Sequence, residues 1–558
     1  MTRRVRSVRR GPARAWILSL VLGLAAATLS WSSPAGADAF RRTGDDLEKA
    51  IDAVLADPRL AGGAASVVVA DAATGDTLYE HRPADRLMPA SNTKLPTSAA
   101  AMELLGPGYR FTTDVLTDGR RSGSVLTGDL YLRGTGDPTM LAKDYDRLAA
   151  DLARSGVKRI TGRLIADDTR FDNQRLGRSW AADDESSYYS AQISPLTVAP
   201  DTDYDAGTVI VEAAPGARAG AKPRVKVTPA NGYVRIDNRA TTLAEGGRRT
   251  LTVEREHGRN TITVTGGIPV GGATAKEWVS VWEPTGYAAA VFADALADHG
   301  VRIEGPTRLG LPTPADAERL AAHRSMPLKK LLVPFMKLSN NNHAEVLTKT
   351  IGYKTTGKGT WSAGLTAIGG YLKRLGVDPG TLRQVDGSGL SRMNTVPARA
   401  FAELLLSVRD EPWYADWYAA LPVACDPDRL TGGTLRGRMC GTAAERNARA
   451  KTGSLTGASA LSGYVTDADG RELVYAIVLN NHLAASVKSV EDAIVVTLAS
   501  WGEDGGADGR SGGTAPARPR GERGADRAGA PGTEPGAESG AESGAEELEC
   551  AWRKPVLC

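Results

Sequence analysis

Ser91-Asn92-Thr93-Lys94 is the stretch that decides the fold of this chain. It leads into residues 94–105, a run of small and apolar residues that favours a helix. A serine at the start of a helix is often no more than an N-cap, so the stretch alone has an ordinary structural explanation. Lys94, however, lies one helical turn after Ser91 and faces the same side. The stretch can therefore place an amine beside a serine hydroxyl.

Two further motifs follow along the chain, Ser339-Asn340-Asn341 and Lys451-Thr452-Gly453. Taken singly, the first could be a polar loop before a helix, and the second could be the ordinary start of a strand. All three motifs occur together, in this order, and each has a fitting local context. Their combination predicts an enzyme with a nucleophilic serine.

The first motif supplies the nucleophile and its base. A serine hydroxyl is a poor nucleophile until a neighbouring base takes its proton. Lys94 can be that base only if its pKa is lowered, which burial beside the like charge of Lys451 would achieve. The Ser339 hydroxyl can relay a proton to a leaving amine, and the Asn341 amide can hold either the Lys94 side chain or the substrate backbone.

The third motif is suited to binding a terminal carboxylate. Lys451 offers a positive charge on a predicted edge strand, while Thr452 and Ser454 offer hydroxyls on either side of Gly453. The backbone N–H groups of Ser91 and Ser454 can form an oxyanion hole. These residues predict a substrate with a free carboxylate next to the bond that is broken.

With these motifs the chain resembles the class C low-molecular-mass penicillin-binding proteins, which are D-Ala-D-Ala carboxypeptidases and endopeptidases. The resemblance spans residues 45–502, with Ser454 standing where the family often has a threonine. It extends to four further segments: Gly134-Thr135-Gly136-Asp137-Pro138, Tyr189-Ser190-Ala191-Gln192-Ile193-Ser194, Asp386-Gly387-Ser388-Gly389-Leu390-Ser391-Arg392 and Gly433-Thr434-Leu435-Arg436-Gly437-Arg438-Met439.

The resemblance implies an α/β (α+β) transpeptidase/β-lactamase-like domain, in which helices flank a five-stranded antiparallel sheet. The domain would comprise residues 40–113 and 324–502, interrupted by a β-rich insertion at 114–323 with room for two subdomains. It also implies an acyl-enzyme at Ser91, acylation by penicillin and β-lactam antibiotics generally, and peptidoglycan stem peptides ending in D-Ala-D-Ala as substrates.

Some relatives hold a stem peptide with a free amine through an acidic, an aromatic and a basic residue. By this resemblance the candidates here are Asp184, Tyr189 and Arg392, with Leu390 and Leu455 as apolar walls. Surface exposure and loop packing would explain the same five residues equally well.

Two other functions compete with the peptidase. A serine β-lactamase needs a second base, in one class a Glu-x-x-Leu-Asn run, and none occurs between Ser91 and Ser339. A catalytically silent relative that only binds the cell wall would be expected to lack at least one of the five reactive motif side chains, and all five are present.

Hydrophobic patterns predict the elements around the motifs. We expect helices at 44–60 and 486–501, and helical periodicity at 328–332 and again after Asn342. The predicted hairpins join 66–69 to 77–79 and 463–466 to 472–479. Alternating strands are expected within the insertion, for example at 125–132 and 261–264.

The N-terminus is typical of a cleaved export signal over residues 1–39, with six arginines, an apolar run at 16–27 and small residues after it. Because this segment holds six arginines and one aspartate, its removal changes the net charge from +3 to −2. Nothing favours a nucleic-acid partner. We expect an extracytoplasmic protein, secreted or held at the cell wall or membrane surface, with a disordered low-complexity tail at 503–558.

The cysteines and histidines do not indicate a metal or cofactor. Of the three possible disulfide pairings we expect the most local, Cys425–Cys440 with Cys550–Cys558. The six histidines are scattered without ligand spacing, and there is no Cys-x-x-Cys.

Overall fold

The structure is a computed structural model that describes residues 35–502. Most of the expected signal segment, the tail at 503–558 and the expected Cys550–Cys558 pair lie outside the described residues. The chain divides into two compact units, Met1–Arg42 and Thr43–Cys558, and the fold and site belong to the second. Among residues 35–502, none of the helices has the length and apolar character needed to cross a membrane.

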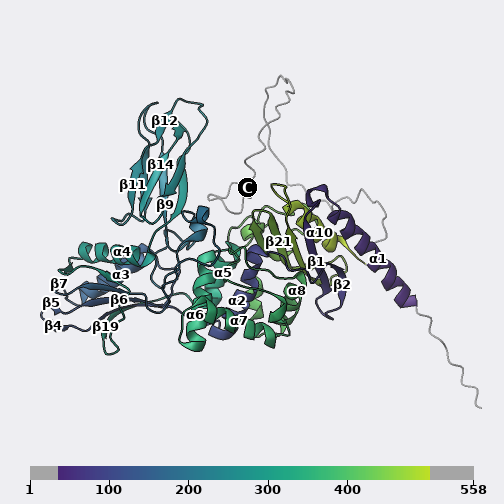
Figure 1. The fold of residues 1–558 in the computed structure, drawn as a ribbon, viewed down its shortest axis with the longest axis horizontal. Helices are drawn as coiled ribbons and strands as arrows, with labels where there is room; N and C mark the ends of the chain where they lie inside the picture. Colours follow the sequence, from purple (N-terminus) through teal and green to yellow (C-terminus); the bar gives the residue numbers. More distant parts are fainter. Residues whose placement is uncertain (1–34, 503–558) are drawn as a thin grey trace, which may run out of the picture. The chain divides into compact units, whose positions relative to one another are not determined.

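The second unit contains the expected five-stranded antiparallel sheet, the central sheet of its helix-covered part (Figure 1). Its strand order is β2-β1-β22-β21-β20, and every neighbouring pair is antiparallel. Both predicted hairpins are confirmed. The strands are β1 (Ala64–Asp71), β2 (Thr77–His81), β20 (Arg449–Leu455), β21 (Ala458–Thr466) and β22 (Glu472–Asn480). Strand β20, which carries Lys451, lies at the edge.

Helices cover both faces of this sheet because both faces are apolar. Along β1, Val67 and Val69 point into one core and Val68 into the other, the period-2 pattern of a strand. The first core is closed by α1 (Ala35–Leu55) and α10 (Lys488–Ser500). The second is closed by α2 (Lys94–Leu105), α5 (Leu328–Lys337), α6 (Asn341–Thr356), α7 (Trp361–Arg374), α8 (Ala398–Ser407) and α9 (Tyr414–Ala419).

The inserted region contains its own sheets and core. One five-stranded sheet has the order β18 (Arg308–Leu309), β8 (Leu164–Asp167), β6 (Leu130–Gly134), β3 (Thr112–Thr117) and β19 (Glu318–Arg324). A four-stranded sheet has the order β17 (Arg302–Ile303), β7 (Arg159–Ile160), β5 (Val125–Thr127) and β4 (Arg120–Ser122). The smaller sheets are β10 (Arg224–Thr228) with β9 (Thr208–Ala214) and β16 (Ala275–Ser280), β11 (Arg235–Asn238) with β14 (Thr261–Thr265) and β13 (Thr252–Arg255), and β12 (Thr241–Leu243) with β15 (Gly267–Pro269).

Two helices also lie in this region, α3 (Ala142–Arg154) and α4 (Pro284–Asp298), although only strands were expected there. Tyr145, Leu148 and Leu152 of α3 are buried at helical spacing, so the sequence carried the signal. Short 3-10 turns complete the second unit: η1 (Pro58–Leu60), η2 (Ala90–Thr93), η3 (Ala182–Asp184), η4 (Tyr188–Ser190), η5 (Pro379–Thr381), η6 (Val408–Asp410) and η7 (Gly433–Leu435).

Two predicted elements have different limits in the structure. The helix expected to run to residue 60 ends at Leu55, because Pro58 disfavours helical backbone before it and begins a separate 3-10 turn. The single strand expected at 125–132 is two strands, β5 and β6, which belong to different sheets. The break falls at Gly128, whose φ of 137° is one that side-chain-bearing residues rarely adopt.

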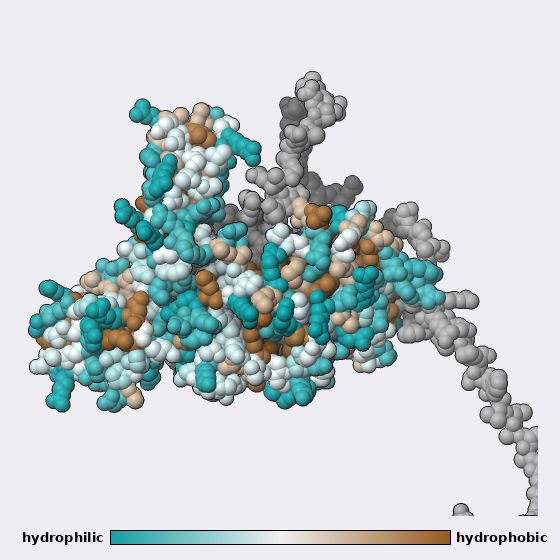
Figure 2. All heavy atoms as spheres, viewed as in Figure 1, coloured by the Kyte–Doolittle hydropathy of each residue, from teal (hydrophilic) through white to brown (hydrophobic). Residues whose placement is uncertain are grey.

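On the surface drawn in Figure 2, hydrophobic residues are scattered in small groups among polar ones.

Candidate active site

Ser91 lies in the turn η2, directly before α2, and is nearly buried. The turn is fastened to the central sheet, since Asn92 Nδ2 donates to Ser462 Oγ on β21 at 2.7 Å. Within the turn, Thr93 Oγ1 donates to the carbonyl of Ala90 at 2.9 Å. These bonds hold the Ser91 hydroxyl on a rigid element rather than on a loose loop.

Lys94 is fully buried beside that hydroxyl. Its Nζ lies 2.8 Å from Ser91 Oγ, 2.6 Å from Asn341 Oδ1 and 2.8 Å from the carbonyl of Ser388. A charged amine donates to all three oxygens. A neutral amine keeps two donors and gains a lone pair, so the Ser91 hydroxyl can then donate to Nζ. The side chain is therefore placed to take the proton of Ser91, and Asn341 holds it there.

The charges of the two buried lysines are not independent. Burial lowers the pKa of Lys94 to about 7, although the carboxylates of Glu345 and Asp386 act in the opposite direction. The pKa of Lys451 lies well below its usual range, because of burial first and then repulsion from Lys94. The expected lowering of the Lys94 pKa thus comes from burial, whereas the like-charge effect is felt mainly at Lys451.

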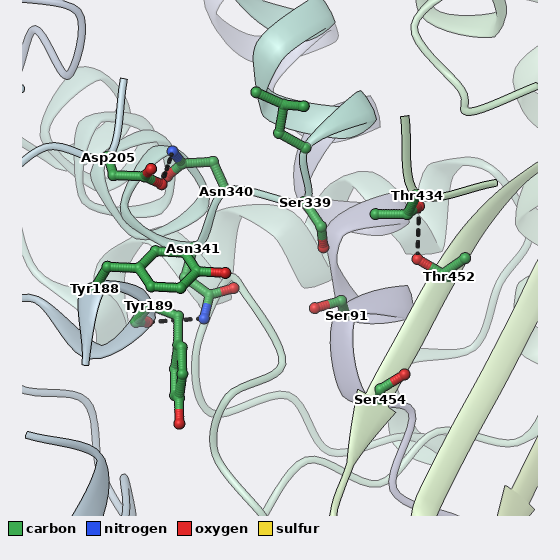
Figure 3. Close-up of a pocket in the computed structure, with 11 residues that line it drawn as sticks. Ser91, Tyr188, Tyr189, Asp205, Ser339, Asn340, Asn341, Thr434, Thr452 and Ser454 are labelled. Carbon is green, nitrogen blue, oxygen red and sulfur yellow. Dashed lines mark hydrogen bonds between the residues drawn. The ribbon is translucent and has the colours of Figure 1, made fainter. Parts of the chain in front are cut away.

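Ser339 and Asn341 approach Ser91 from the turn between α5 and α6. Ser339 has a left-handed backbone, with φ of 58°, and its Oγ accepts from Lys451 Nζ at 2.8 Å. Asn340 caps α6 by accepting from the backbone N–H of His343, which leaves Asn341 as the first helical residue. Figure 3 shows Ser339 and Asn341 on one side of a cleft, with Ser91 between them and strand β20.

Strand β20 forms the opposite wall of the cleft, where Figure 3 shows Thr452 and Ser454. Thr452 Oγ1 donates to Thr434 Oγ1 at 2.9 Å, so two hydroxyls stand together. Gly453 allows the strand to approach the serine turn closely. A Cβ at this position would lie 2.6 Å from the carbonyl oxygen of Pro89 and 3.2 Å from the nitrogen of Ser91. Only glycine fits that spacing.

Three of the five candidate pocket residues meet in one small apolar cluster that includes Ala90 of the serine turn. Leu390 and Leu455 are buried in this cluster, and Tyr189 packs against it. Tyr189 Oη donates to Asp184 Oδ1 at 2.8 Å. The exposed Arg392 donates to the carbonyl of Thr456 at 3.0 Å. The structure therefore brings the acidic and aromatic residues together, and it bonds Arg392 to the residue that follows Leu455.

Several residues that line the cleft were not anticipated from the sequence. Thr434 lies in the family-like segment 433–439, to which the sequence assigns no function. The turn that carries it is closed by the disulfide Cys425–Cys440, a pairing that the structure confirms. Tyr188 and Asp205 come from the inserted region, and Asn340 Nδ2 donates to Asp205 Oδ1 at 3.1 Å. No local pattern distinguishes these two residues from surface polar residues.

One group of carboxylates within residues 35–502 has ligand atoms close enough for a metal ion. Asp201, Asp203 and Asp205 offer oxygen atoms within 4.8 Å of one another. Each carboxylate already accepts a hydrogen bond from a protein side chain, donated by Trp278, Arg429 and Asn340 respectively. These hydrogen bonds join the inserted region to the rim of the cleft.

Comparison with known proteins places this site in context. Residues 47–501 match the D-Ala-D-Ala carboxypeptidase 3 (S13) family. The D-alanyl-D-alanine carboxypeptidase of Actinomadura sp. (strain R39) is 46% identical over 495 residues, which is 88% of this chain and 91% of that protein. Carboxypeptidase DacB of Mycolicibacterium smegmatis is 28% identical, over 82% of this chain and 84% of its own.

Among solved structures, penicillin binding protein 4 (dacB) from Haemophilus influenzae superposes with a TM-score of 0.71. It is 23% identical and covers 80% of this chain and 98% of its own. The expected transpeptidase/β-lactamase-like fold with a large insertion is thereby confirmed.

Proposed function

The chain belongs to the D-Ala-D-Ala carboxypeptidase 3 (S13) family, and from that premise we propose how its residues carry out the reaction. The protein is a serine-type D-Ala-D-Ala carboxypeptidase that acts on peptidoglycan stem peptides. One observation supports the assignment of roles above all others, the 2.8 Å contact between Lys94 Nζ and Ser91 Oγ inside a buried site.

Acylation begins with neutral Lys94 accepting the proton of Ser91. The Ser91 oxygen then attacks the carbonyl carbon between the two D-alanines, and a tetrahedral intermediate forms. The N–H groups of Ser91 and Ser454 stabilise its negative oxygen. The intermediate collapses when the carbon–nitrogen bond breaks, and the peptide remains as an ester on Ser91.

The departing D-alanine needs a proton on its nitrogen. Ser339 Oγ, in contact with Lys451 Nζ, is placed to deliver it and to take a replacement proton from Lys451. Lys451 regains that proton from Lys94, so Lys94 ends the acylation half neutral. In the second half of the reaction Lys94 accepts a proton from water, and the resulting hydroxide equivalent attacks the ester. The shortened peptide leaves, and the proton returns to the Ser91 oxygen.

The free carboxylate of the last D-alanine binds between Lys451 and the paired hydroxyls of Thr452 and Thr434. An incoming carboxylate favours the charged form of Lys451, whose pKa is otherwise held well below its usual range by burial and by Lys94. The restored positive charge would then disfavour a charged Lys94. Substrate binding therefore promotes the neutral form of the base that the reaction needs.

The cluster around Leu390 and Leu455 receives the side chain of the stem peptide on the acyl side. Asp184 and Tyr189 would bind a free ammonium group there, and Arg392 a nearby carboxylate. Asp184→Asn should raise KM for peptides with a terminal amine and leave KM for the N-acetylated peptide unchanged. Equal KM changes for both peptides would contradict this assignment.

We also propose that residues 1–39 direct export and are removed, since the substrate lies outside the cytoplasm, and that β-lactams acylate Ser91. The test of the whole proposal is release of D-alanine from a peptide ending in D-Ala-D-Ala, compared with one ending in D-Ala-L-Ala. We expect release from the first alone, together with a long-lived penicillin adduct. Rapid penicillin turnover without peptide cleavage would instead indicate a β-lactamase, and release from a cross-linked dimer would add endopeptidase action.

A further inference from the structure

The segment Asp386–Ser391 touches the catalytic lysine, although the proposed proton transfers give it no role. The carbonyl of Ser388 accepts from Lys94 Nζ at 2.8 Å, so it is one of three oxygens that fix this amine. The segment packs tightly against the nucleophile turn, because a Cβ on Gly389 would lie 1.8 Å from the carbonyl oxygen of Ala90. Gly389 has a φ of 86°, which also favours glycine.

Glu345 also holds this segment, through two backbone N–H groups. It lies on α6, four residues after Asn341, and is completely buried. Its Oε1 accepts from the backbone N–H of Ser388 at 2.8 Å, and its Oε2 accepts from that of Gly387 at 2.9 Å. The indole of Trp361 donates to the same Oε2 at 2.7 Å. One carboxylate thus fixes the backbone whose carbonyl binds Lys94.

We propose that Glu345 is a positioning residue for acylation: it orients the Gly387–Ser388 backbone so that the Ser388 carbonyl holds Lys94 Nζ against Ser91 Oγ. This inference rests on the proposed roles of Ser91 and Lys94. Glu345 touches neither the substrate nor the nucleophile and acts through the backbone and through its charge.

Asp386 fixes the remainder of the same segment. Its carboxylate accepts from the backbone N–H groups of Gly389 at 2.8 Å and Ser391 at 2.6 Å, and from Asn394 Nδ2 at 2.8 Å. The indole of Trp180 donates to it at 3.0 Å. Asp386 thus fixes the backbone at Gly389 and Ser391, whereas Glu345 fixes it at Gly387 and Ser388. The position of the Ser388 carbonyl therefore depends on Glu345.

The charge of Glu345 is costly to bury, which argues for a use beyond structure. The charged groups around it are Lys94, Asp386 and Lys349, and Lys451 faces Lys94 from β20. Burial and the neighbouring Asp386 raise the pKa of Glu345 to about 7. Its negative form raises the pKa of Lys94. Removal of the Glu345 carboxylate should therefore lower the pKa of Lys94.

The test compares the pH dependence of acylation by a fluorescent penicillin in the wild type, Glu345→Gln and Glu491→Gln. Glu491 is the matched control, because it is also completely buried and hydrogen-bonded, to Arg438 and Ser459, but lies on α10 away from Lys94. For Glu345→Gln we expect the acid limb of the pH–rate profile to move to lower pH by about one unit. This is the size of the pKa shift that a nearby opposite charge causes. We also expect the plateau rate to fall about tenfold or more. The amide oxygen of glutamine can replace one carboxylate oxygen, but the NH2 group in place of the other is a donor and would face a backbone N–H.

Glu491→Gln should lower thermal stability, and its pH profile of acylation should be the same as that of the wild type. The inference is overturned if the Glu345→Gln profile superimposes on that of the wild type, or if both variants lose rate equally at every pH. Should Glu345→Gln fail to fold, Trp361→Phe removes one donor to the carboxylate and keeps an aromatic ring. It should move the acid limb in the same direction, and an unmoved limb would refute the inference. A wild-type protein that does not acylate at all would instead refute the proposed function.

Discussion

Replacing Gly453 with alanine tests whether the close approach of β20 to the serine turn is needed for catalysis. The added Cβ would lie 2.6 Å from the carbonyl oxygen of Pro89, which is 0.8 Å short of the 3.4 Å at which ordinary contact begins. It would also lie 3.2 Å from the backbone nitrogens of Ser91 and Asn92. Every one of these atoms belongs to backbone, so the strand and the turn must move apart.

The displacement separates Ser91 from Ser454, which together are proposed to form the oxyanion hole. A misplacement of about 1 Å in an active site can cost on the order of 100-fold in rate, and we expect a loss of that size in acylation. Overpacking at a buried site should also destabilise the fold by about 1–3 kcal/mol. The measurements are the second-order rate of labelling by a fluorescent penicillin and the free energy of unfolding in urea.

Gly370→Ala is the control substitution. Gly370 lies inside α7, and a Cβ there would meet nothing within 4 Å. The variant should gain about 0.5–1 kcal/mol, because alanine is the better helix former, and should acylate at the wild-type rate. The reasoning fails if Gly453→Ala acylates as fast as Gly370→Ala, since β20 and the serine turn would then not need their close contact.

Two further outcomes follow from the site. Lys94 must be neutral to accept a proton, and its pKa is about 7. The acylation rate should therefore rise with pH through about 7 and fall roughly tenfold for each pH unit below it. A flat rate profile between pH 5 and 8 would contradict the assignment of Lys94 as the base. The Cys425–Cys440 bridge closes a loop with a sequence separation of 15, so replacing both cysteines with serine should cost about 3 kcal/mol of stability. Unchanged urea unfolding of that double variant would show that the bridge is not needed to hold the turn around Thr434.

The first motif and the two hairpins could be predicted because their signals are local, whereas the five-stranded sheet was implied by the resemblance to a family. The hairpins have alternating apolar residues around tight turns, and Lys94 meets Ser91 within a single turn of chain. The contacts that complete the site are not local. Glu345 reaches Ser388 and Asp205 reaches Asn340 only after distant elements pack together, and nothing in the sequence around these residues marks them.

The pKa of Lys94 is lowered, as the sequence predicts. The sequence predicts two causes of this lowering, burial and repulsion from Lys451. In the folded protein Lys94 is buried so completely that loss of water dominates its pKa. Two nearby carboxylates, which the motifs do not include, limit how far the pKa falls.

The most direct test of the central claim is the intact mass of the wild type and of Ser91→Ala after incubation with penicillin. The wild type should gain the mass of one penicillin, on a proteolytic peptide that contains Ser91, while Ser91→Ala should gain none and unfold at the same urea concentration. Equal adducts on both proteins, or an adduct on a peptide without Ser91, would contradict the assignment of the nucleophile.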